Sequence, residues 1–395
     1  MRSFAASQAI RFRRKRTLDY PDVAETISLA VWWAGGVTKA RPDKKPNKWS
    51  AQQQLRLSAP LPAQLLLRAP SAPLHLSPKP STKLAMILII HPELVLAQPL
   101  LENIAPCARL WEIEDIAAFA AGPGAEVRAF ACIGGKRTDA ALFPLFPKLE
   151  AVIAAGVGVD GVDLVAAKAA GISVCNSPGI NTDDVADLAL GLLIAGERNI
   201  IELDGLVRRG EWADALTHAP RYRLRGRTLG ILGMGAIGQA IAVRAEAFGL
   251  KIIWAGPNPK PELVWPRVET VLELAKKSDI LMLACPLTDA TRKVISAEVL
   301  DALGSEGVLI NVARGGVVDE AALLTALREK KILGAGLDVF ENEPTDPKLW
   351  ADLPNVVLTP HVAGRTRESV QEAVRAAIGN LIRLYQGQPL ENRVV

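Results

Sequence analysis

Three side chains suited to acid–base and anion chemistry occur in order in the C-terminal part of the chain. Arg314 follows one apolar run, Glu343 lies just beyond the next, and His361 follows a third. A guanidinium pairs with a carboxylate through two hydrogen bonds and polarises a carbonyl. A histidine exchanges protons near neutral pH, and a carboxylate beside it favours its protonated form. Together the three groups suit chemistry on the carbonyl of a small acid.

Each of these residues also has a plainer explanation. Arg314 can serve a salt bridge at a domain surface, Glu343 can lie in a solvated turn, and His361 can be a loop histidine held by hydrogen bonds. His91, after the first apolar run, is expected to be structural, although a place at an active-site edge stays open. The functional interpretation therefore depends on the three residues occurring together.

A glycine-rich segment upstream indicates a cofactor. Residues 228–232 are mostly apolar, 233–238 read G-x-G-x-x-G, and a helix-forming stretch follows. Gly233 allows the tight turn, Gly235 lets the backbone approach a pyrophosphate, and Gly238 lets the helix pack against the strand. The phosphates would lie at the helix N-terminus. Because a strand is expected before the motif and a helix after it, the motif predicts dinucleotide binding.

The segment after the second strand of this unit favours NADP(H) over NAD(H). An acidic residue about 20 positions beyond the glycines usually binds the adenosine ribose of NAD. Here Gly256 occupies that place. No carboxylate repels a 2′-phosphate, and Asn258 and Lys260 are able to bind one. The alternative is a proline-rich surface loop and NAD as the cofactor.

Segments of strand and helix length alternate from residue 86 onward. The expected strands are 86–90, 127–132, 149–155, 172–175, 229–232, 251–255, 280–284, 308–312, 335–339 and 356–358. The expected helices are 182–197, with Asn181 as N-cap, 236–248, 268–277, 297–303, 320–330 and 366–385. This alternation predicts an α/β fold with parallel sheets buried on both faces.

The carboxyl ends of parallel strands lie at the same edge of a sheet, which is also the edge that binds a dinucleotide. We therefore expect Arg314, Glu343 and His361 to converge near a nicotinamide. There they suit hydride transfer to and from a 2-keto acid.

Composition and charge exclude several other classes of protein. Among the 395 residues, 49% are hydrophobic and 22% are charged, which is ordinary for a globular protein. Residues 86–395 hold 31 Lys/Arg and 38 Asp/Glu, a net charge of −7, which argues against nucleic acid as a partner. The four cysteines show no C-x-x-C spacing, so neither a metal site nor a disulfide framework is expected. Reduced thiols favour the cytoplasm, and no apolar run predicts a membrane span.

Residues 1–85 differ from the rest. They hold 15 Lys/Arg, 4 Asp/Glu and nine prolines, a net charge of +11, and show no sustained period. We expect a largely disordered leader. Its first residues resemble a transit peptide, and a nucleic-acid or membrane tail is a further alternative. Met86 begins a good buried strand, so a chain starting there is expected to fold and work, with the leader an upstream misreading or a dispensable extension.

From residue 86 onward the chain closely resembles the D-isomer-specific 2-hydroxyacid dehydrogenases, most of all their glyoxylate/hydroxypyruvate and hydroxyphenylpyruvate reductase branch. The matching motifs are GMGAIG at 233–238, NVARGG at 311–316, GLDVFENEP at 336–344, TPH at 359–361, AGVGVD at 155–160 and NTDDVAD at 181–187. The resemblance implies two Rossmann-like domains around a cleft, and usually a homodimer. The substrate domain would comprise 86–184 plus 366–395, and the dinucleotide domain 185–365.

The resemblance also implies roles for particular residues. Arg314 would bind the substrate carboxylate and carbonyl, and His361 would be the proton donor and acceptor, with Glu343 as its partner. Backbone N–H groups around Val157 and Gly158 would hold the substrate carboxylate. The implied cofactor contacts are Val185, Gly233, Gly235, Ala236, Ile237, Gly238, Gly256, Asn258, Lys260, Cys285, Pro286, Val312, Ala313, Asp338, His361 and Gly364, with Asp338 at the nicotinamide carboxamide.

Two alternatives remain beside an NADP(H)-preferring 2-keto-acid reductase. A 3-phosphoglycerate dehydrogenase is disfavoured because the chain ends soon after its last expected helix. A dinucleotide-sensing binding protein of the same fold is disfavoured by the intact set of Arg314, Glu343 and His361. Pro257 and Asn258 stand where NADP-linked relatives tend to carry arginine, which is a departure from the family pattern.

Overall fold

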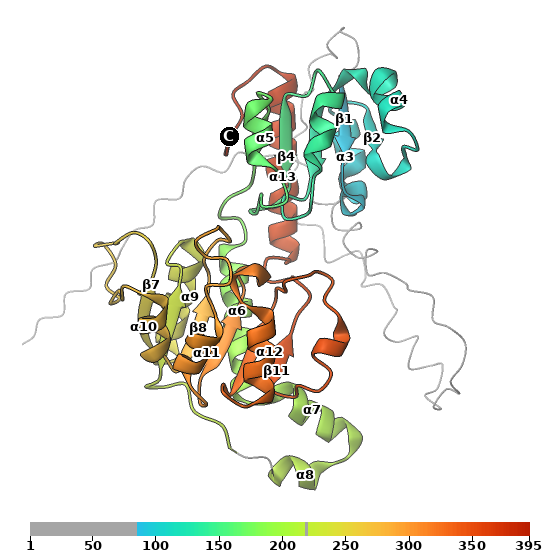
Figure 1. Cartoon of the computed structure of the whole chain (residues 1–395). Coiled ribbons are helices and arrows are strands. Elements are labelled where there is room, and N and C mark those ends of the chain that lie inside the picture. Colours follow the sequence, from blue (N-terminus) through green and yellow to red (C-terminus); the bar gives the residue numbers. More distant parts are fainter. Residues whose placement is uncertain (1–84, 218–219) are drawn as a thin grey trace, which may run out of the picture.

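Two parallel β-sheets form the framework of the computed structural model, which describes residues 85–217 and 220–395. Figure 1 shows the two sheets in separate units, joined by α6 and α13. The predicted leader lies outside the described residues, apart from residue 85. Among the described residues, no helix combines the length and the apolar content that crossing a membrane requires.

The first sheet has the strand order β2-β1-β3-β4-β5, and every neighbouring pair is parallel. Its strands are β1 (Met86–Ile89), β2 (Cys107–Arg109), β3 (Val127–Cys132), β4 (Ala151–Ala154) and β5 (Ser173–Cys175). The helices of this unit are α3 (Gln98–Glu102), α4 (Ile116–Ala121), α5 (Leu164–Ala169) and α13 (Arg367–Tyr385). Short 3-10 helices η2 (Pro92–Ala97), η3 (Leu110–Glu112), η4 (Pro123–Glu126) and η5 (Ala140–Leu145) connect them.

The second sheet has the order β11-β10-β9-β8-β6-β7 and is also parallel throughout. Its strands are β6 (Thr228–Leu232), β7 (Lys251–Ala255), β8 (Ile280–Leu283), β9 (Val308–Asn311), β10 (Gly334–Leu337) and β11 (Val356–Leu358). Its helices are α6 (Thr182–Glu197), α7 (Ile200–Arg209), α8 (Trp212–Thr217), α9 (Ala236–Ala247), α10 (Val271–Lys276), α11 (Ala297–Leu303) and α12 (Glu320–Arg328), with 3-10 helices η6 (Gly315–Val317) and η7 (Pro347–Leu349).

Helices cover both faces of the second sheet. On one face, Leu190 of α6 and Ile241 of α9 are buried in a common core. On the other face, Leu274, Leu300 and Leu323 come from α10, α11 and α12. Burial on both faces explains why strands such as β8 and β9 are apolar without alternation. The predicted α/β fold with two Rossmann-like units is therefore confirmed.

The sequence did not predict β2, α7 or α8. β2 is a three-residue strand whose residues are all half-buried, so it has no apolar run. α7 and α8 have no buried residues, and they lie between the predicted helix at 182–197 and the glycine motif. Asn181 occupies the N-cap position of α6, but the predicted capping hydrogen bond from its side chain is absent.

The chain crosses between the two units twice, before α6 and before α13. The crossings touch, because a Cβ atom added to Gly364 would lie 2.2 Å from Nδ2 of Asn181. α13 then packs against β4, and the Tyr385 hydroxyl donates to the Met86 carbonyl oxygen at 2.8 Å. The domain boundaries at 184/185 and 365/366 stay predictions.

Candidate active site

The turn between β6 and α9 has the geometry that the glycine motif predicts. Gly233 has a φ of 97°. A Cβ atom on it would lie 2.6 Å from the Cys285 backbone nitrogen, and one on Gly238 would lie 2.1 Å from the Gly233 carbonyl oxygen. Gly235 has open space where a side chain would be. The turns after β6 and β8 therefore meet at the point where the strand order reverses, which is where this fold class binds nucleotides.

The first turn of α9 suits a phosphate. Gly235 and Ala236 are exposed, and Gly235 precedes the helix in an extended conformation without a side chain. The first backbone N–H groups of a helix lack partners within the helix and carry its positive dipole end. The chain thus fits a dinucleotide pyrophosphate at Ala236 and Ile237 by shape and by charge.

The segment after β7 contains a cation that the sequence did not reveal. Arg267 forms a parallel bridge with Trp254 and donates from Nε and Nη2 to the Gly256 carbonyl oxygen at 3.3 and 3.0 Å. Its guanidinium carbon lies 5.9 Å from the centre of the Trp254 ring. Asn258 is exposed and Lys260 half-buried. The proline-rich loop itself contains no arginine, and Arg267 reaches it because the chain returns alongside Trp254 beyond the loop.

A buried asparagine shapes the turn that presents Arg314. Asn311 is 1% exposed and ends β9. Its Oδ1 accepts from the Ala313 backbone N–H at 3.0 Å, and its Nδ2 donates to the Arg314 carbonyl oxygen at 3.1 Å. Val312 and Ala313 are buried on opposite faces of the sheet. The turn is therefore anchored on both sides, and Arg314 leaves the sheet edge in a defined direction.

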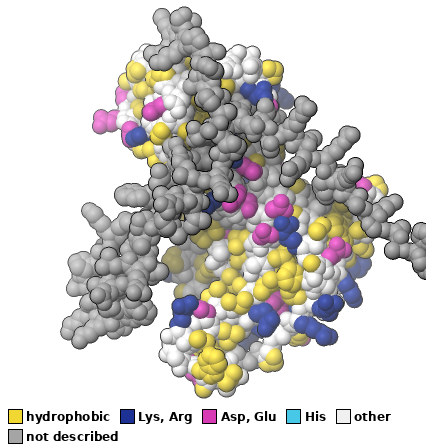
Figure 2. All heavy atoms as spheres, turned by 180° about the vertical axis from the view of Figure 1, so that it is seen from behind, with side chains coloured by type: hydrophobic (Ala, Val, Ile, Leu, Met, Phe, Trp, Pro, Cys, Tyr) yellow, Lys and Arg dark blue, Asp and Glu magenta, His cyan; other side chains and the backbone are white. Residues whose placement is uncertain are grey.

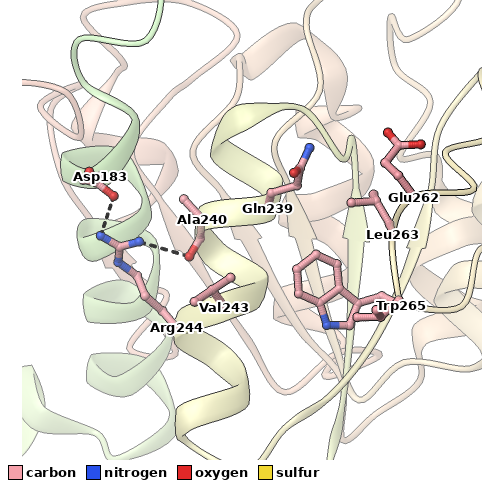
Figure 3. Close-up of a pocket in the computed structure, with 9 residues that line it drawn as sticks. Asp183, Gln239, Ala240, Val243, Arg244, Glu262, Leu263 and Trp265 are labelled. Carbon is pink, nitrogen blue, oxygen red and sulfur yellow. Dashed lines mark hydrogen bonds and ion pairs between the residues drawn. The ribbon is translucent and has the colours of Figure 1, made fainter. Parts of the chain in front are cut away.

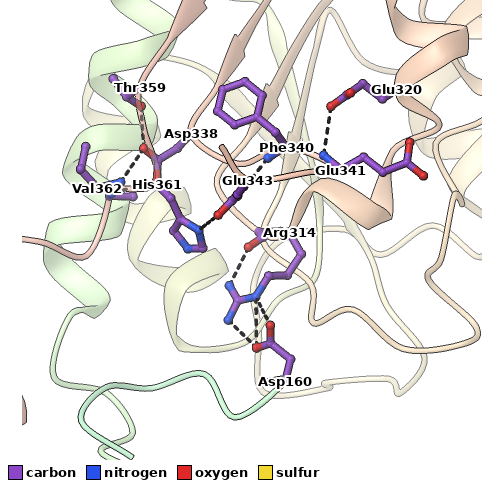
Figure 4. A network of polar contacts seen from close by, with 12 residues as sticks. Asp160, Arg314, Glu320, Asp338, Phe340, Glu341, Glu343, Thr359, His361 and Val362 are labelled. Carbon is purple, nitrogen blue, oxygen red and sulfur yellow. Dashed lines mark hydrogen bonds and ion pairs between the residues drawn. The ribbon is translucent and has the colours of Figure 1, made fainter. Parts of the chain in front are cut away.

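Arg314 reaches from the second unit to the first, where it pairs with Asp160 (Figure 4). Its Nε lies 3.2 and 3.1 Å from the two carboxylate oxygens, and its Nη2 donates to Oδ1 at 2.9 Å. A Cβ atom on Gly158 would lie 2.4 Å from Nη2. Nearby, Asn176 Nδ2 donates to the Val157 carbonyl oxygen at 2.7 Å. The 156–161 loop and Arg314 thus form one surface, although the sequence did not indicate the role of Asp160.

Asp338 holds the turn that carries His361. The carboxylate is 1% exposed and accepts from the Thr359 hydroxyl at 2.6 Å and from the backbone N–H groups of Val362 and Ala363 at 2.9 and 2.8 Å. In addition, the His361 N–H donates to the Asp338 carbonyl oxygen at 2.7 Å. Asp338 therefore caps backbone donors, and its contact with a nicotinamide stays a prediction.

His361 and Glu343 form a pair at this edge. His361 has a φ of 54°, and its Nδ1 lies 2.7 Å from Glu343 Oε2. The other oxygen of Glu343 accepts from the Phe340 N–H at 3.1 Å. The hydrogen bond to Glu343 raises the pKa of His361 above its ordinary value, although burial and Arg314 act to lower it. Burial acts to raise the pKa of Glu343, but His361 holds it below its ordinary value.

The remaining predicted positions lie around this edge. Val185 is buried in the core that also contains Val312, and Cys285 is buried beside Gly233. Burial raises the pKa of the Cys285 thiol to about 11, so the thiol is neutral. Pro286 is exposed, and Gly364 packs against Asn181. All four cysteines are free.

A hollow outside this edge does not involve these groups. It lies beside α9 and is bordered by Gln239, Val243, Glu262 and Trp265 (Figure 3). None of the predicted cofactor or substrate residues lines it. We therefore place the candidate site at the edge where the glycine turn, Arg314 and the His361–Glu343 pair lie.

The fold and these groups define a class of protein. A parallel α/β unit with a glycine-rich turn at its strand reversal is a dinucleotide-binding unit. A histidine paired with a carboxylate, together with an arginine at the same edge, equips it for carbonyl–alcohol chemistry. The class is that of the dinucleotide-dependent oxidoreductases.

Comparison with known proteins narrows this class. Residues 190–363 match the family model for the D-isomer specific 2-hydroxyacid dehydrogenase, NAD binding domain. The chain is 44% identical over 287 residues to the hydroxyphenylpyruvate reductase of Plectranthus scutellarioides, covering 73% of this chain and 91% of that protein. It is 43% identical to a glyoxylate/hydroxypyruvate reductase of Arabidopsis thaliana, with 68% and 86% covered.

Solved structures agree with this result. The NADPH-dependent glyoxylate/hydroxypyruvate reductase of Sinorhizobium meliloti, solved with NADP and malonate, superposes with a TM-score of 0.72 at 38% identity, over 79% of this chain and 97% of that one. The 2-hydroxyacid dehydrogenase of Ketogulonicigenium vulgare gives 0.75 at 37% identity, over 80% and 99%. The chain therefore belongs to the D-isomer-specific 2-hydroxyacid dehydrogenases, in their reductase branch.

Proposed function

We propose that this enzyme reduces a 2-keto acid of the glyoxylate, hydroxypyruvate or hydroxyphenylpyruvate type to the D-2-hydroxy acid, with NAD(P)H as the reductant. The substrate types come from the names of its relatives. The observation that carries the proposal is the His361–Glu343 pair, at 2.7 Å, on the same sheet edge as Arg314 and the glycine turn. This set combines an acid, its partner and an anion-binding cation.

Arg314 is the group that we assign to the substrate carboxylate and carbonyl. Its guanidinium has five N–H donors, and three nitrogen-to-carboxylate contacts hold it on Asp160. Gly158 lies beside this guanidinium, and we assign the backbone N–H groups around Val157 and Gly158 to the same carboxylate. Binding there would orient the carbonyl carbon and draw electron density toward its oxygen.

His361 is the group that we assign to proton transfer. When bound, the reduced nicotinamide supplies the hydride for the carbonyl carbon. As negative charge develops on the carbonyl oxygen, His361 donates a proton to it, and in the reverse direction His361 accepts that proton. Glu343 on Nδ1 favours the protonated ring, and we assign Nε2 to the substrate.

The cofactor contacts are proposed from the same edge. The pyrophosphate would lie on the N–H groups of Ala236 and Ile237. The other residues that we assign to cofactor contacts are Val185, Gly233, Gly235, Gly238, Cys285, Pro286, Val312, Ala313, Asp338, His361 and Gly364.

We further propose that NADP(H) is preferred over NAD(H). Gly256 has no carboxylate to repel a 2′-phosphate, and Arg267, which also pairs with Glu269 at 2.7 Å, is hydrogen-bonded to its carbonyl oxygen. Asn258 and Lys260 follow in the same loop. Opposite charge and hydrogen bonding would therefore favour the phosphorylated ribose.

A homodimer is the proposed assembly. Along α7 and α8, Ile201, Val207, Trp212 and Leu216 are 63, 48, 64 and 74% exposed. Figure 2 shows hydrophobic side chains at the lower end of the second unit, the end where these helices lie in Figure 1. Exposed apolar groups on a projecting pair of helices suit burial against a second copy. The cytoplasm stays the predicted location.

The test is absorbance of the reduced nicotinamide during reactions of purified protein with NADPH or NADH and glyoxylate, hydroxypyruvate or 4-hydroxyphenylpyruvate. Oxidation of NADPH by one of these acids supports the reductase proposal, and faster turnover with NADPH than with NADH supports the cofactor preference. Tight cofactor binding without turnover of any of the six pairs would favour a dinucleotide sensor instead.

A further inference from the structure

The strand order of the first sheet reverses between β1 and β3, and this position is occupied by a histidine. In open parallel sheets, the crevice outside the carboxyl ends at such a reversal is where ligands usually bind. Here His91, two residues beyond β1, is 8% exposed. The imidazole therefore lies at the carboxyl ends of the strands, in the position where folds of this kind usually have a ligand-binding crevice.

His91 holds both ends of the loop that follows β3. Its Nδ1 accepts a hydrogen bond from the Ile133 backbone N–H at 3.0 Å, and its Nε2 lies 3.1 Å from the Arg137 carbonyl oxygen. Both contacts are satisfied by the neutral ring with its proton on Nε2. Burial lowers the pKa of His91, which keeps the ring in this neutral form. Within the loop, Lys136 N–H donates to the Ile133 carbonyl oxygen at 2.9 Å.

This loop is in turn fixed to the 156–161 loop by backbone contacts. Gly161 N–H donates to the Gly134 carbonyl oxygen, and Thr138 N–H donates to the Gly161 carbonyl oxygen, both at 2.8 Å. A Cβ atom on Gly134 would lie 2.0 Å from the Gly158 carbonyl oxygen. The two main chains thus touch, so a displacement of the first loop displaces Gly158.

We propose that His91 is a positioning residue for the substrate. Through the 133–137 loop, it fixes the backbone N–H groups around Val157 and Gly158 and the carboxylate of Asp160 that holds Arg314. It touches neither substrate nor cofactor. The inference rests on the proposed function, because it assumes that these groups bind the carboxylate of a 2-keto acid.

Removing the imidazole has a predictable physical effect. An apolar side chain in its place leaves the N–H of the half-buried Ile133 and the carbonyl oxygen of the exposed Arg137 without their partner. The loss is costly chiefly at Ile133, where water has less access to the unpaired group. The 133–137 loop would move to recover partners, and the carboxylate-binding groups would move with it. Binding of the keto acid would weaken, whereas the glycine turn and His361 belong to the second unit and would keep their geometry.

The experiment compares His91→Leu, His91→Asn and His91→Gln with the wild-type enzyme, using hydroxypyruvate and NADPH. Asparagine can accept from Ile133, and glutamine can donate to Arg137. We expect His91→Leu to raise KM for the keto acid by about tenfold, with kcat changed less than about threefold and NADPH affinity unchanged. His91→Asn and His91→Gln should each restore part of the KM.

Phe143→Leu is the matched control, because it weakens the core of the same unit through the Phe130 contact and Phe143 belongs to neither loop. An unchanged KM in His91→Leu, or an equal KM rise in Phe143→Leu at a similar loss of melting temperature, would overturn the proposal. If His91→Leu does not fold, a wild-type KM in both His91→Asn and His91→Gln would overturn the proposal. A wild-type enzyme without any turnover would refute the proposed function instead.

Discussion

The two sides of the candidate site are built in different ways. On the side of the second sheet, buried side chains hold the turns: Asn311 fastens the turn of Arg314, and Asp338 fastens the turn of His361. On the side of the first sheet, the 133–138 and 156–161 loops are joined to each other by backbone hydrogen bonds and by glycines that let the main chains touch. The second-sheet side presents Arg314 and the titratable His361–Glu343 pair, whereas the first-sheet side presents backbone amides beside the Asp160 carboxylate.

This difference predicts a division of function. Groups that titrate can change charge during the reaction, whereas amides carry fixed partial charges and suit binding of an anion. Substitutions of the titrating pair on the second-sheet side, His361 and Glu343, should therefore change kcat and its pH dependence. Substitutions on the first-sheet side should change KM. The following predictions are arranged from the largest expected effect to the smallest.

His361→Asn should lower kcat by about 10²- to 10⁴-fold, because the developing alkoxide loses its proton donor. The NADPH dissociation constant, measured by fluorescence titration, should stay nearly unchanged. Unaltered turnover would exclude His361 as the acid–base group. It would also contradict the assignment of proton transfer to the second-sheet side.

Glu343→Gln should lower kcat by roughly ten- to a hundredfold and move the alkaline limb of the pH profile toward acid. The pKa of His361 is raised chiefly by its hydrogen bond to Glu343. Reduction needs protonated His361, so kcat/KM is level below this raised pKa and falls as the pH rises through it. Without the carboxylate, the fall begins at lower pH. Glu341→Gln, two residues away, is the control and should keep the wild-type profile.

The same pair makes stability depend on pH. The raised pKa of His361 contributes stability that is present below the ordinary histidine value and is lost as the pH rises through the folded-state pKa. The lowered pKa of Glu343 contributes stability that is present above the ordinary value and is lost as the pH falls through the folded-state pKa. Urea unfolding should therefore show the largest loss in Glu343→Gln between about pH 4.3 and 6.5.

Arg267→Leu should reduce the ratio of kcat/KM for NADPH to that for NADH by about five- to tenfold, since a charge-assisted contact with the 2′-phosphate is lost. Arg328→Leu removes an arginine that is paired with a different carboxylate, Asp352, and serves as the control. An equal loss with both cofactors would show that Arg267 only supports the fold around Trp254.

Asp160→Asn should raise KM for the keto acid by about three- to fivefold and leave kcat unchanged, in keeping with the small contribution of a partly exposed ion pair. Asparagine keeps one acceptor for Arg314 but loses the charge. Initial-rate kinetics beside Asp352→Asn measure the effect. A fall in kcat without a change in KM would show that the two sides of the site do not divide their functions as described.

The sequence predicted the second-sheet side better than the first because function there depends on side-chain identity. Arg314, Glu343 and His361 each end or follow a strand, so their convergence follows from parallel topology. The glycine turn could also be predicted from the sequence, since each of its glycines is required for a steric reason. Arg267 was missed because its contact with Gly256 requires the chain to return alongside Trp254, which no local pattern encodes.

On the first-sheet side, the contacts that matter join main chains distant in sequence. Gly134 and Gly161 look like ordinary turn glycines until their neighbours are known. His91 was expected to be structural with an active-site edge left open, and in the structure its ring nitrogens contact Ile133 and Arg137 of the loop after β3. A single histidine after a strand could not show which loop it would hold.

Asn181 and Gly364 meet where the chain crosses twice between the two units, and α13 begins three residues beyond Gly364. With 19 residues, this helix is about 28 Å long. A rotation of the two units by about ten degrees about that contact would carry the far end of α13 by roughly 5 Å. His361, three residues before Gly364, would scarcely shift. Such a rotation would move the far end of α13 while it left the proton-transfer group almost in place.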